Sequence, residues 1–198
     1  MAYPENDIIY RTYGEFGDIS CGFLSKAGIR FDRVDTNPRN LALVYVLRGH
    51  GTYIDRYGKR HGLSGGVAFQ RIPGMVHSTI LDPASDWAEC FVQFPARLFE
   101  AMKRFDFFNT REPVLWIGDD VAFPAGVALM LRELKYASQE DIGMYTTRIL
   151  AMISEMYRKA QRVHERSGYD TLVRRACILL ESDMETKKSI RECLVPIP

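Results

Sequence analysis

The feature that most constrains the fold is a dense run of short strand-like segments between residues 41 and 94. Residues 41–47 form a continuous apolar stretch of strand length, and residues 67–72 form another, which ends at Pro73-Gly74. Short apolar runs bounded by glycine and proline are typical of buried strands. Repeated strands of this kind, joined by tight turns, predict an antiparallel β-barrel or sandwich.

The last strand of this region, residues 87–94, alternates between two faces. One face carries Trp87, Glu89, Phe91 and Gln93, and the other carries Ala88, Cys90, Val92 and Phe94. Successive side chains of a strand point to opposite sides of a sheet, so the two sets face different surroundings. The first set combines a carboxylate, an amide and aromatic rings, as a polar pocket would require.

Helical periodicity replaces the strand pattern after Pro95. A short helix is expected around residues 98–108, and a second after residues 119–120, whose aspartates can cap it. The longest is expected over residues 141–166, where apolar positions recur in coiled-coil steps of three and four. This apolar face either packs on the barrel or pairs with the same helix of a second copy. The interface residues of the second arrangement would be Tyr145, Ile149, Met152, Ile153 and Met156.

The pattern changes again near residue 167. Ser167-Gly168-Tyr169-Asp170 interrupts the helical periodicity and predicts a linker, after which another helix is expected. Ser189-Ile190-Arg191-Glu192 has the form of a capping box, which predicts the start of one more helix. Because that helix would continue beyond Pro198, we interpret the sequence as part of a longer protein.

Composition and charge narrow the class of protein. Hydrophobic residues make up 46% of the chain and the net charge is +1, which predicts a packed domain that does not grip nucleic acid by itself. The cysteines are far apart, at Cys21, Cys90, Cys177 and Cys193. This spacing predicts reduced thiols in the cytoplasm rather than a zinc site or a disulfide scaffold. No signal peptide or membrane-spanning segment is expected.

Four features, in this order, resemble the AraC family of bacterial transcription regulators. They are a barrel with Arg48-Gly49-His50-Gly51, then Pro73-Gly74-Met75-Val76-His77, then helices, and then the capped segment Ser189-Ile190-Arg191-Glu192-Cys193-Leu194. Members similar to the arabinose regulator have an N-terminal cupin-like domain, which binds a ligand and dimerises, followed by two helix-turn-helix units. The resemblance covers about residues 40–165 for the sensor and 170–198 for the start of the DNA-binding domain.

The resemblance implies a β fold with C-terminal α-helices, a cupin-like jelly-roll barrel followed by helices. The regions that it implies are an N-terminal arm (1–20), a sensor barrel (21–96), a helical dimerisation region (97–166) and a linker with the first helix-turn-helix helices (167–198). Two partners are expected. One is a small-molecule effector, which is expected to be a carbohydrate, and the other is a second copy of the chain in a homodimer. DNA is expected to bind only through the domain beyond Pro198. No catalytic residue, metal or cofactor is implied.

By the same resemblance, the ligand site lies in the barrel, under the N-terminal arm. The residues carried over to it are Arg33, His77, Thr79, Glu89, Phe91 and Gln93. A sugar needs an aromatic face for its C–H surface and polar groups for its hydroxyls, and Phe91, Glu89 and Arg33 supply these types. Each also has a structural interpretation. His77 closes a turn, Phe91 packs in the core, and Glu89 and Arg33 are solvated or form a surface ion pair.

A metal-dependent cupin enzyme, an isomerase or dioxygenase, is the alternative function. Such enzymes bring three imidazoles and a carboxylate to one metal. Here His77 fits one ligand position, but His50 has Thr52 in the place of its partner, and the nearest acid is Asp55. The sequence therefore favours a sensor over an enzyme. A barrel that dimerises but has lost its ligand is the third interpretation.

Overall fold

The computed structural model describes residues 3–103 and 107–184, with side chains as far as residue 165. It divides into two compact units, Met1–Lys159 and Ala160–Pro198, whose boundary lies inside one helix. Within the described residues, no helix is both long enough and apolar enough to cross a membrane. The first unit contains all the strands that the structure describes.

The described strands form two antiparallel sheets. The larger sheet contains, in spatial order, β1 (Asp7–Thr12), β2 (Asp18–Ser25), β9 (Ala88–Phe94), β4 (Leu41–Arg48), β7 (Val67–Arg71) and β10 (Val114–Trp116). The smaller sheet contains β3 (Phe31–Thr36), β8 (His77–Leu81), β5 (His50–Ile54) and β6 (Arg60–Ser64). Without β1 and β10 at the edges, the order is β2-β9-β4-β7 against β3-β8-β5-β6, that of an eight-stranded jelly roll. The predicted fold class, a cupin-like jelly roll followed by helices, is confirmed.

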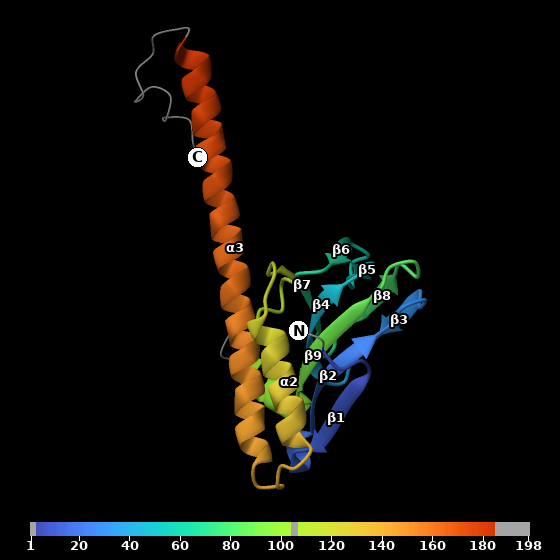
Figure 1. Cartoon of the computed structure of the whole chain (residues 1–198). Coiled ribbons are helices and arrows are strands. Elements are labelled where there is room, and N and C mark those ends of the chain that lie inside the picture. The colour runs from blue at the N-terminus through green and yellow to red at the C-terminus, as the bar shows by residue number, and fades with distance from the viewer. Residues whose placement is uncertain (1–2, 104–106, 185–198) are drawn as a thin grey trace. The chain divides into compact units, whose positions relative to one another are not determined.

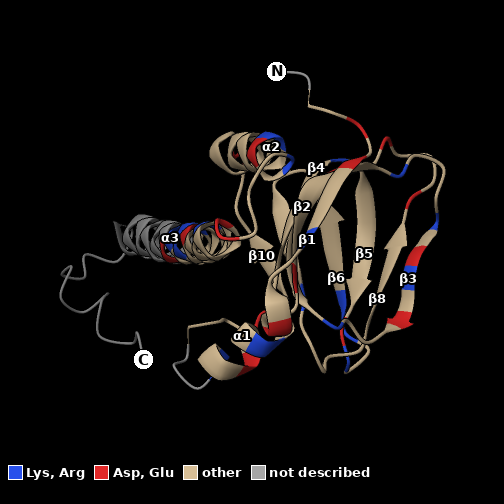
Figure 2. Cartoon of the chain, turned by 90° about the horizontal axis from the view of Figure 1, so that it is seen from below, with Lys and Arg blue, Asp and Glu red and all other residues tan. Residues whose placement is uncertain are grey.

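The described helices all follow β9, and a short 3-10 turn, η1 (Gly14–Phe16), joins β1 to β2. The helices are α1 (Ala96–Met102), α2 (Ala122–Leu134) and α3 (Ile142–Met184). Figure 1 shows α2 and the first part of α3 beside the strands. In Figure 2 both lie on the outer side of the larger sheet, away from β3 and β8. The first unit therefore has three layers, with the larger sheet in the middle.

Because the larger sheet is the middle layer, both of its faces are buried. Toward the smaller sheet lies an apolar core cluster of Val44, Val46, Tyr53, Leu63, Val67, Phe69, Leu81, Trp87 and Phe91. On the opposite face, the fully buried side chains of the strands and α2 include Ile19, Cys21, Cys90, Val92, Val127, Met130 and Leu134. The alternation predicted for residues 87–94 thus places Phe91 in the barrel and Cys90 under the helices.

Two segments differ from the sequence-based expectation. Residues 7–12, expected within an N-terminal arm, form β1 and pair with β2 from Asp7↔Phe23 to Thr12↔Asp18. The helix break expected at residues 167–170 is wrong, because α3 continues through them to Met184. A single glycine in a helix costs only about 1 kcal/mol, which a long helix tolerates. The predicted capping box at residues 189–192 lies outside the described residues.

The substitution Gly22→Ala tests how closely β1 lies on β2. A Cβ atom at Gly22 would come within 2.4 Å of the Asp7 carbonyl oxygen and 2.8 Å of Ile8 Cα. Because these are backbone atoms, we expect β1 to separate from β2 and the free energy of unfolding to fall by about 2 kcal/mol. Urea unfolding and amide hydrogen exchange over residues 7–12 measure this effect. Gly62→Ala is the matched control, since its Cβ would meet open space; equal effects of the two changes would contradict the prediction.

Candidate functional site

Four charged side chains meet inside the barrel and form what we call the charge cluster, Lys26, Asp32, Arg71 and Glu89. Glu89, on β9, is 1% exposed, and its Oε1 lies 2.6 Å from Lys26 Nζ and 3.8 Å from a terminal nitrogen of Arg71. Asp32, on β3, has its carboxylate oxygens 2.9 Å from Lys26 Nζ and 2.9 Å from the same Arg71 nitrogen. Two cations and two anions are thus brought together, so their formal charges cancel.

Hydrogen bonding and mutual attraction both hold the charge cluster in its buried position. Trp87 Nε1 donates a hydrogen bond of 2.8 Å to Glu89 Oε2. Burial alone would raise the pKa of Asp32, but the positive charges of Arg71 and Lys26 outweigh it and hold this pKa below its ordinary value. Charges in such surroundings are tolerated only when each has a partner, because removing one leaves an uncompensated charge away from water.

Several buried polar atoms of the barrel strands find no hydrogen-bond partner among the residues that the structure describes. They are Ser20 Oγ, Arg71 Nε, His77 Nε2 and Thr79 Oγ1. Leaving a buried polar group without a partner costs about 1–3 kcal/mol, so such groups call for an ordered water or a bound molecule. These atoms belong to two hydroxyls, an imidazole and a guanidinium, groups that between them donate and accept hydrogen bonds.

His77 is the titratable group that lies beside the charge cluster. Its ring stacks on Tyr53, with the ring centroids 5.2 Å apart and the planes 9° from parallel. Burial, reinforced by the positive charge of Arg71, lowers the pKa of His77 to about 4. The imidazole is therefore neutral at neutral pH. Its Nδ1 lies 3.5 Å from the Met75 carbonyl oxygen, a long contact that gives limited support to the turn-closing interpretation.

The predicted ligand residues occupy four kinds of position. His77, Thr79 and Glu89 are buried in the barrel interior. Phe91 belongs to the apolar core cluster, as its structural interpretation requires, and Gln93 is half-buried. Arg33 is exposed, so the side chain that β3 contributes to the interior is that of its neighbour, Asp32.

Sequence reasoning missed three members of the charge cluster. Arg71 is the last residue of β7, directly after a run of buried residues. A charged residue at the end of a buried strand could have indicated a charge inside the barrel. Lys26 and Asp32 flank the connection between β2 and β3, where no clear alternation shows which side chains point inward. Their positions follow from the way in which β3 crosses to the smaller sheet.

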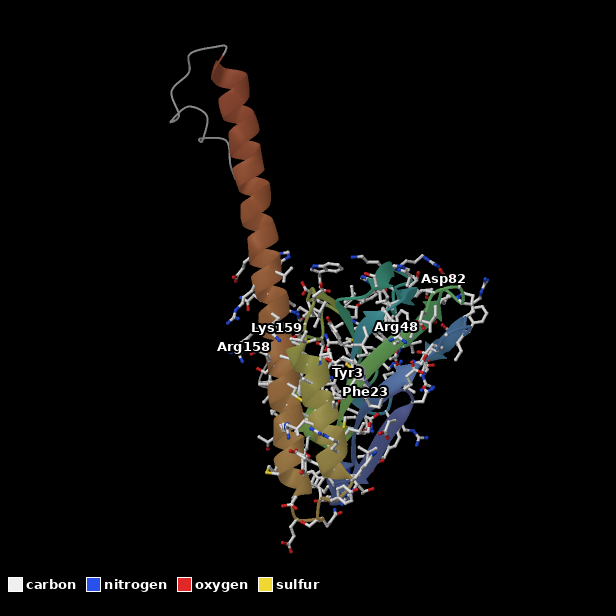
Figure 3. The ribbon with its side chains drawn as sticks, in the orientation of Figure 1. Tyr3, Phe23, Arg48, Asp82, Arg158 and Lys159 are labelled. Carbon is white, nitrogen blue, oxygen red and sulfur yellow. The ribbon has the colours of Figure 1, made fainter. Side chains whose placement is uncertain are left out.

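The N-terminal residues pack against β2 and the end of β4. Tyr3 stacks on Phe23 with the ring centroids 5.2 Å apart (Figure 3), and Glu5 lies 3.4 Å from Arg48. These residues line a cavity of about 180 Å³ that Glu89 also lines. The side chain of Glu89 is itself fully buried, so this cavity borders the charge cluster without exposing it.

The apolar face of α3 is buried within the protomer. Tyr145 is 7% exposed, the side chain of Met152 lies beside Gly126 of α2, and three further members of the face are fully buried: Ile149, Ile153 and Met156. Packing against its own domain is therefore the arrangement of this helix as far as Lys159. The homodimer stays a prediction, and in this arrangement its interface would have to use other residues.

Gln70, on β7, connects the barrel to α3. Its carbonyl oxygen accepts a hydrogen bond of 3.2 Å from the hydroxyl of Tyr53, the residue that stacks on His77. Its side-chain oxygen accepts one of 2.7 Å from the hydroxyl of Tyr157 on α3, and its side-chain nitrogen donates to the carbonyl oxygens of Asn109 and Glu112. Tyr53, Gln70 and Tyr157 therefore connect His77 to α3.

A second contact fixes α3 at the end of the first unit. Lys159 pairs with Asp120, which precedes α2, whereas its neighbour Arg158 pairs with Glu155 on the same helix (Figure 3). Asp120 in turn accepts a hydrogen bond of 2.8 Å from the Ala122 backbone N–H in the first turn of α2. The start of α2 and the far end of this part of α3 are thereby held together.

The histidines do not form the group that a metal-dependent enzyme would need. Within the described residues, no three His, Cys, Asp or Glu side chains gather as metal ligands. His61 pairs with Asp55, with Nε2 3.0 Å from Oδ2, while His77 stacks on Tyr53 and His50 is exposed. His61 also meets the edge of Tyr53, with the ring centroids 6.2 Å apart, so the ring of Tyr53 contacts both His61 and His77.

Comparisons with known proteins find similarity to solved structures alone. No family model and no curated protein matches the sequence. Among solved structures, the chain is similar to a cupin protein from Bacteroides fragilis, with 20% identity over 40% of this chain and 65% of that one, and a TM-score of 0.32. It is also similar to ToxT from Vibrio cholerae O395 bound to (E)-4-(8-methylnaphthalen-1-yl)but-3-enoic acid, with 8% identity over 73% and 57% of the two chains and a TM-score of 0.47. A third similar structure is oxalate decarboxylase from Bacillus subtilis, with 13% identity over 39% of this chain and 21% of that one, and a TM-score of 0.32. The chain spans less than two thirds of each of these proteins, and the likeness concerns the fold alone.

The substitution Glu89→Gln tests the charge cluster. It removes one negative charge and leaves Lys26 and Arg71 facing Asp32 alone, so we expect the free energy of unfolding to fall by about 3 kcal/mol. Urea unfolding followed by tryptophan fluorescence measures the loss. The matched control is Glu15→Gln, because Glu15 pairs with Arg97 at the exposed surface and its loss should have little effect.

A double variant separates charge balance from loss of packing. Lys26→Met combined with Glu89→Gln leaves one cation and one anion in the cluster, so it should recover part of the stability lost in Glu89→Gln. Two results would contradict the proposed charge balance. One is a Glu89→Gln variant as stable as the unmodified protein, and the other is a double variant whose loss of stability equals the sum of the losses of its two single variants.

His77 predicts a defined dependence of stability on pH. Its pKa is about 4 in the folded chain and about 6.5 when unfolded, so the unfolded state takes up the proton first as the pH falls. The contribution of His77 to the free energy of unfolding is fully present above about pH 6.5 and is lost progressively as the pH falls from 6.5 to 4. His77→Gln should remove this component. Urea unfolding at intervals from pH 7.5 to 4.5 measures it, and parallel curves for the two proteins would contradict the assignment.

Proposed function

We propose that the jelly roll is the ligand-sensing domain of a transcription regulator of the AraC type, and that its effector is a small neutral polyol, a carbohydrate. The observation that carries the proposal is the set of buried polar atoms without partners: Ser20 Oγ, Arg71 Nε, His77 Nε2 and Thr79 Oγ1. A sugar presents several hydroxyls, each both donor and acceptor, and so can satisfy groups of both kinds at once.

The charge balance of the barrel interior supports a neutral ligand. Lys26 and Arg71 are already matched by Asp32 and Glu89, and His77 is neutral. A charged effector would enter low-dielectric surroundings with no counter-charge to spare, at a cost of several kcal/mol. A polyol adds hydrogen bonds without disturbing that balance. In this proposal the N-terminal residues, of which Tyr3 and Glu5 line the neighbouring cavity, act as the lid that the family resemblance implies.

The sensor needs a connection from ligand to helix, and Gln70 supplies it in this proposal. A molecule bonded to His77 Nε2 restrains the imidazole, which stacks on Tyr53, and Tyr53 and Tyr157 both bond to Gln70. In this proposal these connected residues adopt more than one arrangement. The ligand changes the position of α3 to the extent that it binds one of these arrangements better than another. The helix that receives the effect continues into the second unit of the chain.

The regulatory part of the proposal rests on the sequence resemblance. The Pro73-Gly74-Met75-Val76-His77 segment, the jelly roll and the capped segment at residues 189–194 occur in the order expected of the family. In this proposal the protein is a cytoplasmic homodimer that reaches DNA through the domain that begins near the end of this sequence. It has no catalytic residue, metal or cofactor of its own.

A thermal-stability panel tests the ligand class. The chain is heated with monosaccharides and disaccharides, and separately with divalent metals with and without a chelator. One sugar should raise the melting temperature, because a ligand present at a hundredfold excess over its dissociation constant adds about 2.7 kcal/mol of stability. A shift that requires metal and disappears with the chelator would favour the cupin enzyme instead. No shift with any polyol would favour a barrel without a ligand.

The substitution Thr79→Val identifies the site within the barrel. Thr79 Oγ1 has no partner among the described residues, so removing it should leave the stability of the free protein unchanged or slightly raised. The affinity for the sugar found in the panel should fall about tenfold, the effect of one hydrogen bond. Thr147→Val, at an exposed position on α3, is the matched control. Unchanged affinity in Thr79→Val, measured by calorimetry, would place the sugar elsewhere.

A further inference from the structure

A second cavity lies at the rim of the barrel, apart from the charge cluster. It has a volume of about 270 Å³ and is formed where the turn after β5, the loop between β7 and β8, and the segment before β10 meet. Tyr53 lines it, and the ring of this residue also stacks on His77 in the interior. Tyr53 is 2% exposed, so its ring contributes to the wall between the rim cavity and the barrel.

Part of the rim cavity is apolar and open to solvent. Met75, Val76 and Pro113 contribute to its lining, and Val76 is 41% exposed although its side chain is apolar. An apolar surface inside a concavity is where a ligand gains most from leaving water. At about 270 Å³ the cavity falls just below the range of drug-sized sites, roughly 300–1,000 Å³, so its ligand should be small.

The charged residues of the rim cavity favour an anion. Arg56 and Arg111 both line it and both are exposed. The one carboxylate among the lining residues, Asp55, is already engaged, since it accepts the backbone N–H groups of Tyr57 and Lys59 and pairs with His61. Two guanidinium groups therefore border a cavity whose only lining carboxylate is committed to its own turn.

The two arginines differ in how far they are committed. Arg56 lies over the ring of Tyr57, 4.6 Å from its centroid, and bonds to the hydroxyl of the same residue. For Arg111, no ion pair forms with any residue in the part of the chain that the structure describes. A guanidinium is suited to a carboxylate through two parallel hydrogen bonds. Arg111 is accordingly the residue that would hold the anionic group.

We infer that the rim cavity binds a small organic anion with an apolar body, an arylalkyl carboxylate in size and chemistry. Its carboxylate pairs with Arg111 and its ring lies against Met75 and Val76. This site is distinct from the interior one, which holds equal numbers of opposite charges and suits a neutral polyol. The segment that carries Arg111 is bonded to Gln70 through Asn109 and Glu112, so the bound anion lies next to the residue that contacts α3.

The test uses 3-phenylpropionate and 3-phenylpropanamide, which match in shape and differ in charge. The full chain carries methionine labelled with carbon-13 at the methyl group, and the Met75 signal is assigned with Met75→Leu. The carboxylate should shift the Met75 methyl signal in a saturable way and leave that of Met130, which is fully buried, unchanged. The amide should bind at least about fivefold more weakly, the effect of one exposed ion pair of about 1 kcal/mol.

Two variants connect the binding to this cavity. Arg111→Gln should abolish the preference for the carboxylate, whereas Arg39→Gln, an exposed arginine outside the cavity, should keep it. Val76→Trp should fill the cavity and abolish binding without lowering the melting temperature. Equal binding of the two probes, a preference that survives in Arg111→Gln, or no saturable shift of Met75 would overturn the inference. None of these measurements includes a sugar, so the rim cavity is tested independently of the interior site.

Discussion

The pairing of Glu89 and Asp32 with Lys26 and Arg71 is the interaction on which the barrel most depends. Three of these residues come from the larger sheet or directly follow one of its strands, and Asp32 comes from β3 in the smaller sheet. The pairing of β3 with β8 is interrupted by register shifts on both sides of Arg33. Backbone pairing alone therefore fixes β3 weakly, and the two ion pairs of Asp32 add a side-chain constraint that joins the sheets.

Gln70 has a comparable role on the opposite face of the larger sheet. It is fully buried, and its backbone and side chain together bond to Tyr53, Tyr157 and the segment that leads into β10. An apolar residue at this position would leave several of those groups without partners, each at about 1–3 kcal/mol. The barrel, the β10 segment and α3 are consequently fixed to one another at a single side chain.

Sequence patterns predicted the layers of this fold better than the contents of its interior. The apolar runs at residues 41–47 and 67–72 became β4 and β7, and the alternation after Trp87 gave both faces of β9 correctly. Those patterns work because burial repeats along a strand with period two. Asp32 was missed in favour of its neighbour Arg33, because β3 has no apolar alternation and a shift of one residue reverses which side chain points inward.

The same limit explains the C-terminal half. Apolar residues at coiled-coil spacing identify a helix with one apolar face. They do not show whether this face packs on a second copy or on its own domain, since both offer an apolar surface. In this chain α3 meets its own domain instead, since Met152 lies beside Gly126 of α2 and Tyr157 bonds to Gln70 of β7, while α2 packs on β2 and β9. A sheet buried on both faces needs a third layer, and α2 with the first part of α3 is the segment long enough to form one.

The two candidate sites differ in electrostatics and share a wall. The interior is balanced in charge and holds buried polar atoms without partners, whereas the rim cavity is open and bordered by Arg56 and Arg111. Tyr53 lies between them, and burial raises the pKa of its hydroxyl to about 12. Because this hydroxyl does not ionise at physiological pH, any influence of one site on the other has to pass through the position of the ring and its bond to Gln70 rather than through a change of charge.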